Sequence, residues 1–276
     1  MNSYIQNNEY IPLIKKIKRK RTVVIVLTII AELIALLLCA PIEVVVFDKT
    51  MVLNKGLNPI FTILIVLGIY ICEIFACAIV LTPLTSSMSV ECDPKKHLIL
   101  NDALNKQKNK DYIYAVDLMY MGDFKAALDY ANKMIAGNKP MMVNIGLFNK
   151  ARCEFFLGDF DSLKSTVKQY EIALNNSKNI SKKTKATYNK ILKTMNLLVA
   201  ISEEDKNGIS NFSSIEMWNK SKATEGYINY LKAIAAYMTE NKQEAIYRFM
   251  FVKENYEKTI FSQFSQQYLS KLSADS

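Results

Sequence analysis

Two long apolar segments lie near the start of the chain, and a polar region with helical periodicity follows them. The segments are 22–40 and 60–81, and they contain one charged residue each, Glu32 and Glu73. At 1.5 Å per residue the first spans about 28 Å, close to the hydrocarbon thickness of a bilayer. The aliphatic residues of each segment outweigh the cost of one carboxyl group, so both segments are expected to cross a membrane.

Basic residues flank these segments and predict their orientation. Lys and Arg residues are concentrated at 15–21, directly before the first segment, and Lys95 and Lys96 follow the second segment. Because positively charged flanks stay in the cytoplasm, we expect a transmembrane hairpin in a multi-pass protein of the cell membrane, with both termini cytoplasmic. The predicted domains are a basic cytoplasmic N-terminal segment (1–21), the transmembrane hairpin (22–94) and a cytoplasmic helical domain (95–276).

An antiparallel hairpin would place Glu32 and Glu73 at similar depth in the membrane. One interpretation is a proton or cation site, because ionisable residues inside a membrane are commonly functional. The other is structural, with two neutral acids that hydrogen-bond to each other, to Thr28 or to a second copy of the chain. Either interpretation favours packing of the two spans or a homo-oligomer formed through them.

A repeated pattern appears beyond the apolar segments. The sequence Gly-Asp-Phe-Lys-Ala-Ala at 122–127 recurs as Gly-Asp-Phe-Asp-Ser-Leu at 158–163, thirty-six residues later. A small residue, Ala115 or Ala151, precedes each glycine by seven positions, and an altered third copy lies at 240–245. Small residues let two helices approach closely, and glycine permits the left-handed backbone that ends a helix.

This pattern resembles the tetratricopeptide repeat family in divergent form, over residues 109–255. The resemblance implies an all-α fold in which pairs of antiparallel helices stack into an α-solenoid. The segment from Thr184 to Ile201 has one apolar stripe and is expected to form a further helix with a short, Ser/Asn-rich partner around 209–218. A final helix, Thr259–Leu272, is expected to cap the stack with a polar outer face.

In this family the first helix of each pair lines a concave groove that binds peptides. By match to the motif, the groove candidates are mainly aromatic: Tyr112, Met119, Tyr120, Phe148, Arg152, Phe155, Phe156, Tyr227, Tyr230 and Tyr237. Aromatic and arginine side chains are the usual anchors of interfaces. The alternative is that several of them are core residues between neighbouring helices. Arg152 is the residue most expected to contact a partner.

A second candidate surface is basic and lies on or just before the helix that starts at Thr184. Its residues are Lys178, Lys182, Lys183, Lys185, Lys190 and Lys193. Lysines at an anionic membrane surface contribute up to about 1 kcal/mol each, so this face would lean on anionic lipid or meet an acidic partner. A solvated helix face is an equally open interpretation.

Composition narrows the chemistry. The net charge is +9, yet no eight residues in a row are basic and Arg is scarce, so nucleic-acid binding is not expected. His97 is the only histidine, the five cysteines form no Cys-x-x-Cys pair, and the eight glycines form no phosphate-binding loop. We therefore expect no catalytic site, cofactor or metal. The abundance of Lys, Asn and Ile over Arg indicates an AT-rich, bacterial genome.

These observations predict a non-enzymatic scaffold or adaptor, anchored in the membrane, whose repeat domain binds a protein or peptide at the cytoplasmic face. Tethering raises the local concentration of whatever the domain binds. The alternative is an accessory subunit of a membrane transport or assembly complex, in which Glu32 and Glu73 act within the membrane.

Overall fold

The computed structural model describes residues 8–39, 42–46, 49–54, 59–104, 110–137, 139–176 and 181–274. The chain divides into two compact units, Met1–Thr85 and Ser86–Ser276, and each is described by itself. Over the described residues the units are helical apart from one short β-hairpin, in agreement with the all-α class that the sequence predicts.

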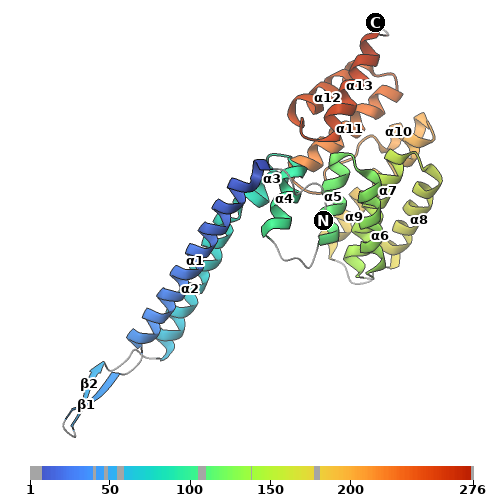
Figure 1. The fold of residues 1–276 in the computed structure, drawn as a ribbon. Helices are drawn as coiled ribbons and strands as arrows, with labels where there is room; N and C mark the ends of the chain where they lie inside the picture. The colour runs from blue at the N-terminus through green and yellow to red at the C-terminus, as the bar shows by residue number, and fades with distance from the viewer. Residues whose placement is uncertain are drawn as a thin grey trace. The chain divides into compact units, whose positions relative to one another are not determined.

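The first unit is a pair of long helices that lie side by side, with the β-hairpin between them in sequence (Figure 1). Its elements are η2 (Asn8–Tyr10), α1 (Ile11–Cys39), β1 (Ile42–Val46), β2 (Lys49–Asn54) and α2 (Pro59–Val80). The strands pair antiparallel, with Val44 opposite Met51. A run of β-branched residues in β1 explains why a strand forms here, where the apolar pattern alone predicts only a connection.

One narrow face of each long helix is turned toward the other. Val24 and Ala35 on α1, and Val66 and Ile69 on α2, are less exposed than most of their neighbours. The separations of eleven residues on α1 and three residues on α2 place each pair on one side of its helix, as in a packing seam. Outside the seam the aliphatic side chains are uncovered, and Ile79, for example, is 71% exposed.

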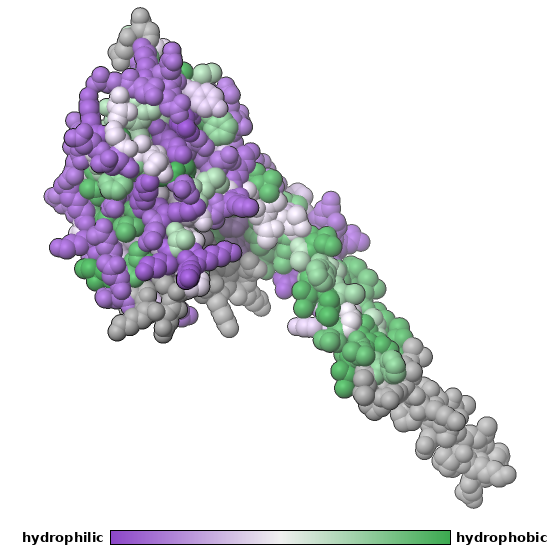
Figure 2. Space-filling view, turned by 180° about the vertical axis from the view of Figure 1, so that it is seen from behind, coloured by the Kyte–Doolittle hydropathy of each residue, from purple (hydrophilic) through white to green (hydrophobic). Residues whose placement is uncertain are grey.

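Hydrophobic residues predominate on the visible face of the two helices between their basic end and the part drawn in grey (Figure 2). Soluble monomers rarely expose a continuous apolar surface of this extent. Among the described residues one helix, Phe61–Val80, is long and apolar enough to cross a membrane. The first predicted span ends at Ala40, which lies outside the described residues.

The second unit consists of helices of one to six turns. They are α3 (Thr82–Ser89, which crosses the unit boundary), α4 (Pro94–Leu104), α5 (Lys110–Met121), α6 (Phe124–Ala136), α7 (Pro140–Leu157), α8 (Phe160–Asn176), α9 (Lys182–Ser202), α10 (Lys206–Phe212), α11 (Lys222–Met238), α12 (Lys242–Asn255) and α13 (Ile260–Ala274). From α4 on, most successive helices pack against each other, and α5 contacts α7, α7 contacts α9 and α11 contacts α13. The helices expected at 184–201 and 259–272 are confirmed as α9 and α13.

The boundary between the units lies earlier than the change in composition near Asp93 and Pro94. Ser87, Cys92 and Asp93 are buried in the second unit. A carboxylate oxygen of Asp93 accepts a hydrogen bond from the Lys258 ammonium at 2.8 Å. Burial and this ion pair hold the segment after Thr85 in the helical unit.

The repeated Gly-Asp motif forms the same turn in both copies. Gly122 and Gly158 have φ angles of 87° and 76°, in the left-handed region. The aspartate that follows each glycine accepts a hydrogen bond from a backbone N–H in the first turn of the next helix. Left-handed glycine ends one helix, and the aspartate caps the next.

Two further turns have the same form without glycine. Glu204 and Glu240 adopt φ angles of 53° and 62°, and the next residue, Asp205 or Asn241, caps the following helix. Their spacing is again thirty-six residues. The turn before α10 is therefore a further copy of the motif, which the sequence hides because glutamate replaces glycine.

Candidate functional site

The predicted groove residues come together, but the chain's own last helix fills the space between them. The ring of Phe261 on α13 lies 5.4 Å from Tyr120, 5.6 Å from Phe156, 5.3 Å from Tyr227 and 5.1 Å from Tyr230, measured between ring centroids. Phe261 is fully buried. The expected open groove is therefore corrected to an aromatic core, because α13 inserts its apolar face there and does not serve only as a polar cap.

Burial separates the groove candidates into three groups. Six are buried, namely Met119, Tyr120, Phe148, Arg152, Tyr227 and Tyr230. Phe155, Phe156 and Tyr237 are half-buried, and Tyr112 is exposed. Six of the ten candidates thus lack the exposed surface that a partner would need.

Arg152, the residue most expected to meet a partner, lies in a cage of aromatic rings. Its guanidinium carbon is 4.1 Å from the Tyr227 ring centroid, 5.0 Å from Phe148 and 5.1 Å from Tyr120. Nη1 donates a hydrogen bond to the Asn149 side chain at 3.3 Å. At 2% exposure, Arg152 stabilises the core by cation–π contacts and is not a surface anchor.

His97 also has a structural setting. Its Nδ1 lies 2.7 Å from a carboxylate oxygen of the buried Asp117, and this pair joins α4 to α5. Burial raises the pKa of Asp117 to about 6, and the hydrogen bond from His97 opposes that rise. Burial likewise raises the pKa of the Cys92 thiol to about 12, so this cysteine stays protonated and unreactive.

A concave polar surface lies elsewhere in this unit, between α10, α11 and α12. The cavity measures about 320 Å³, and we call it the Lys232 pocket. Its hydroxyl groups come from Ser210, Ser213, Ser214 and Thr239, its small apolar side chains from Ala235 and Ala236, and its remaining lining from Lys232, Asn241, Glu244 and Arg248. Hydroxyls, alanines and two cations form a surface suited to an extended anionic chain.

Lys232 is the unusual member of this pocket. It is half-buried, and no ion pair to it occurs within the described part of the chain. Burial lowers the pKa of Lys232, and the nearby Arg248 lowers it further. The two nearby carboxylates, Glu216 and Glu244, oppose this lowering of the pKa, although each is paired with another cation, Lys190 or Arg248.

Arg248 is fixed within the pocket. Its Nε donates to a carboxylate oxygen of Glu244 at 2.5 Å, and Nη1 donates to the Asn229 side chain at 2.7 Å. Asn241 in turn accepts a hydrogen bond from the backbone N–H of Glu244. The pocket therefore combines a guanidinium held by two hydrogen bonds with an ammonium that makes no ion pair within the described residues.

The predicted basic face of α9 reaches this pocket at one end. Lys193 donates to the backbone and side-chain oxygens of Ser214, at 3.3 and 2.6 Å, and Lys190 pairs with Glu216 at 2.7 Å. Lys182, Lys183 and Lys185 are exposed, whereas Lys178 lies outside the described residues. The pattern of lysines on α9 thus indicates one side of the site, while Lys232 and Arg248 come from helices that the basic pattern did not single out.

Glu32 and Glu73 are both half-buried on the seam sides of α1 and α2. Within the described residues neither has a hydrogen-bond or ion-pair partner. The Thr28 hydroxyl donates to the carbonyl of Val24, at 3.0 Å, and not to Glu32.

No group of three or more His, Cys, Asp or Glu side chains that could hold a metal ion occurs in the described ranges. Comparison with protein-family models, with curated proteins and with solved structures finds no match to this chain. The function must therefore be inferred from the geometry of the site.

Proposed function

We propose that this protein is a membrane-anchored scaffold whose helical unit, a divergent tetratricopeptide-like repeat, binds an acidic segment of a protein partner in the Lys232 pocket. The observation that carries the proposal is the half-buried side chain of Lys232, which lines a cavity with hydroxyl groups and makes no ion pair within the described residues. A carboxylate that entered the pocket would pair with this ammonium directly.

The shape of the pocket favours a peptide over a compact ion. A volume of about 320 Å³ is at the lower end of the range for ligand sites and exceeds the size of a single carboxylate. Ala235 and Ala236 leave room for a backbone to approach, and the serine hydroxyls both donate and accept hydrogen bonds. The partner expected here is an extended segment with Asp or Glu side chains or a free C-terminus.

Membrane attachment would keep this pocket, and any bound partner, near the membrane surface. The apolar surface of Phe61–Val80 supports one span, and the apolar run of α1 supports a second that returns the chain to its starting side. The basic residues before α1 favour a cytoplasmic location for both termini. A bound partner is then held near the membrane at a raised effective concentration, with no chemical step required.

A photoreactive amino acid at Ser210, an exposed position that lines the pocket, tests the proposal in cells. We expect a discrete cross-linked product that disappears in Lys232→Met and persists in Lys168→Met, a matched loss of an exposed lysine on α8. If the same product forms from Lys185 and survives Lys232→Met, the outer face of α9 is the contact surface and the pocket is not.

A second function, as an accessory subunit of a transport or assembly complex, is favoured by one observation. Glu32 and Glu73 lie half-buried on the seam with no partner in the described residues, an arrangement that is costly in a membrane unless it is used. The double variant Glu32→Gln, Glu73→Gln separates the two functions. In this variant, membrane localisation and the cross-link from Ser210 are expected to persist for either function. A scaffold also keeps its cellular activity, whereas a transport subunit loses it.

A further inference from the structure

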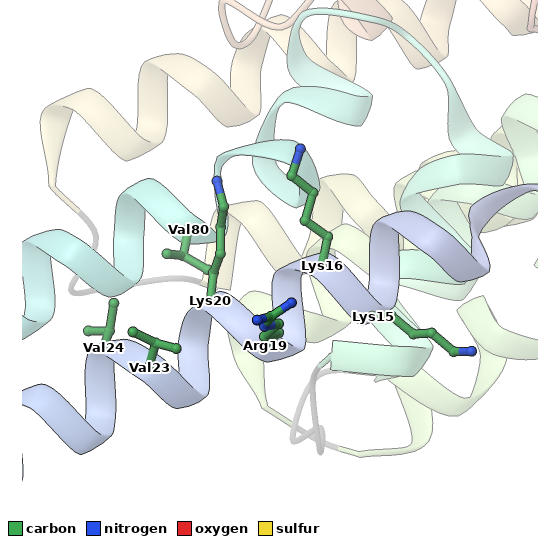
Figure 3. A pocket seen from close by; sticks show the side chains of 7 residues that line it. All are labelled: Lys15, Lys16, Arg19, Lys20, Val23, Val24 and Val80. Carbon is green, nitrogen blue, oxygen red and sulfur yellow. The ribbon is translucent and has the colours of Figure 1, made fainter.

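A second cavity belongs to the first unit and is independent of the Lys232 pocket. It lies where the basic end of α1 meets the end of α2, and it measures about 620 Å³ (Figure 3). We call it the hairpin cavity. Lys15, Lys16, Arg19 and Lys20 of α1 supply its charged groups, and Val23, Val24 and Val80 supply its apolar wall.

The cations of the hairpin cavity make no ion pair among the residues that the structure describes. Within the same ranges none of them forms a hydrogen bond from its side chain. Lys16 and Lys20 are one turn apart on α1 and extend toward the same side (Figure 3). Positive groups on successive turns of one helix face repel one another, and an anion near Lys16 and Lys20 would reduce that repulsion.

The wall of the cavity shows that a simple anion is not the complete ligand. Val24 on α1 and Val80 at the end of α2 are half-buried, and Val23 is 50% exposed. The apolar wall continues along the helices into the uncovered aliphatic surface, where Leu27 is 60% and Ile79 is 71% exposed. A ligand that satisfies the whole cavity has a negatively charged head and a hydrocarbon chain that leaves it along the helices.

We infer that the hairpin cavity binds an anionic phospholipid of the membrane in which the hairpin lies, with its phosphate among Lys16, Arg19 and Lys20 and an acyl chain against Val24 and Val80. Basic pockets beside membrane helices on the cytoplasmic side recognise lipid headgroups through this combination of charge and apolar contact. The inference rests on the proposed membrane anchoring but not on the Lys232 pocket or its partner.

The test uses the full chain, purified in a neutral detergent, with bound lipids counted by native mass spectrometry. Phosphatidylglycerol is expected to remain bound at concentrations where phosphatidylcholine does not. Lys16→Gln, Arg19→Gln and Lys20→Gln together are expected to weaken phosphatidylglycerol binding on the order of tenfold or more. The matched control is Lys125→Gln, Lys168→Gln and Lys253→Gln, which removes the same charge from exposed positions of the helical unit and is expected to leave binding unchanged.

A variant that leaves the charge intact tests the cavity itself. Val80→Trp fills the apolar wall and is expected to reduce phosphatidylglycerol binding as strongly as the triple variant, without altering the residues that orient the hairpin. Glycerol phosphate, which has the anionic group and no hydrocarbon chain, is expected not to compete.

Three results would overturn the inference: equal binding of phosphatidylcholine, competition by glycerol phosphate, or an equal loss in the control that replaces Lys125, Lys168 and Lys253. The proposed anchoring fails separately, if alkaline carbonate releases the wild-type protein from membranes. If the wild-type protein resists carbonate and still cross-links from Ser210, but binds phosphatidylcholine as well as phosphatidylglycerol, the lipid site alone is refuted.

Discussion

Replacing Phe261 by alanine probes the contact that closes the predicted groove. The side chain is fully buried, and four aromatic rings surround it at 5.1 to 5.6 Å. Phe→Ala substitutions in packed cores cost about 3–5 kcal/mol, and aromatic pairs contribute about 0.5–1.5 kcal/mol beyond their buried area. We therefore expect Phe261→Ala to lower the free energy of unfolding of the helical unit by about 4 kcal/mol.

The single tryptophan provides the assay. Trp218 packs edge-on against Phe148 at 4.9 Å and against Tyr227 at 6.1 Å, and Tyr227 contacts Phe261 directly. Urea unfolding of the full chain in detergent, followed by Trp218 fluorescence, reports on this cluster.

A matched control is Tyr247→Ala, which removes an aromatic ring that is 65% exposed on α12. Its expected cost is below about 0.5 kcal/mol. If Phe261→Ala costs less than about 1 kcal/mol, or no more than this control, then α13 is not part of the core and the groove is open.

Two further predictions concern backbone strain and pH. Gly122→Ala is expected to destabilise the helical unit by about 1–3 kcal/mol more than Gly158→Ala. The reason is that a Cβ at Gly122 would lie 2.9 Å from the Ile260 side chain, whereas nothing lies within 4 Å of a Cβ at Gly158. Equal midpoints of urea unfolding for the two variants would contradict this prediction. Burial raises the pKa of Asp117 from 3.8 to about 6, so the folded state binds this proton more tightly and the stability from this group is lost as the pH rises. The stability of the wild type relative to Asp117→Asn is therefore expected to fall by about 2 kcal/mol between pH 4 and pH 7, and a constant difference across this range would refute the assignment.

The helices and two of the turns are predictable from the sequence because local physics determines them. Gly122 and Gly158 mark left-handed positions that few other residues adopt, and the aspartates after them cap the next helix. The helix α9 is predictable from the apolar stripe that includes Ile191 and Met195, both of which are buried.

The turn at Glu204 is not predictable in the same way. Glutamate has no preference for the left-handed backbone, and its φ angle of 53° is imposed by the neighbouring helices and by the cap at Asp205. The spacing of thirty-six residues to the turn at Glu240 is the one sequence signal that could have revealed it.

The groove and the pocket differ from the sequence prediction for a tertiary reason. The pattern around Tyr120, Arg152 and Tyr227 identifies one face of the first helices, but not what covers that face. Phe261 lies more than one hundred residues beyond Arg152 and Tyr120 in the sequence, so its packing against this face is a long-range contact. Lys232 was missed because an unpaired charge can be recognised only when the positions of all the neighbouring carboxylates are known.

In the proposed topology, α1 and α2 form a hairpin across the membrane, and the helical unit lies on the cytoplasmic side. Two single-cysteine additions test it, Thr50→Cys in β2 and Glu240→Cys at an exposed turn of the helical unit. Intact cells are treated with a membrane-impermeant maleimide, and the wild type, with its own five cysteines, gives the background. We predict labelling of Thr50→Cys on intact cells and labelling of Glu240→Cys only after permeabilisation; labelling of both positions from the same side of the membrane would contradict the account.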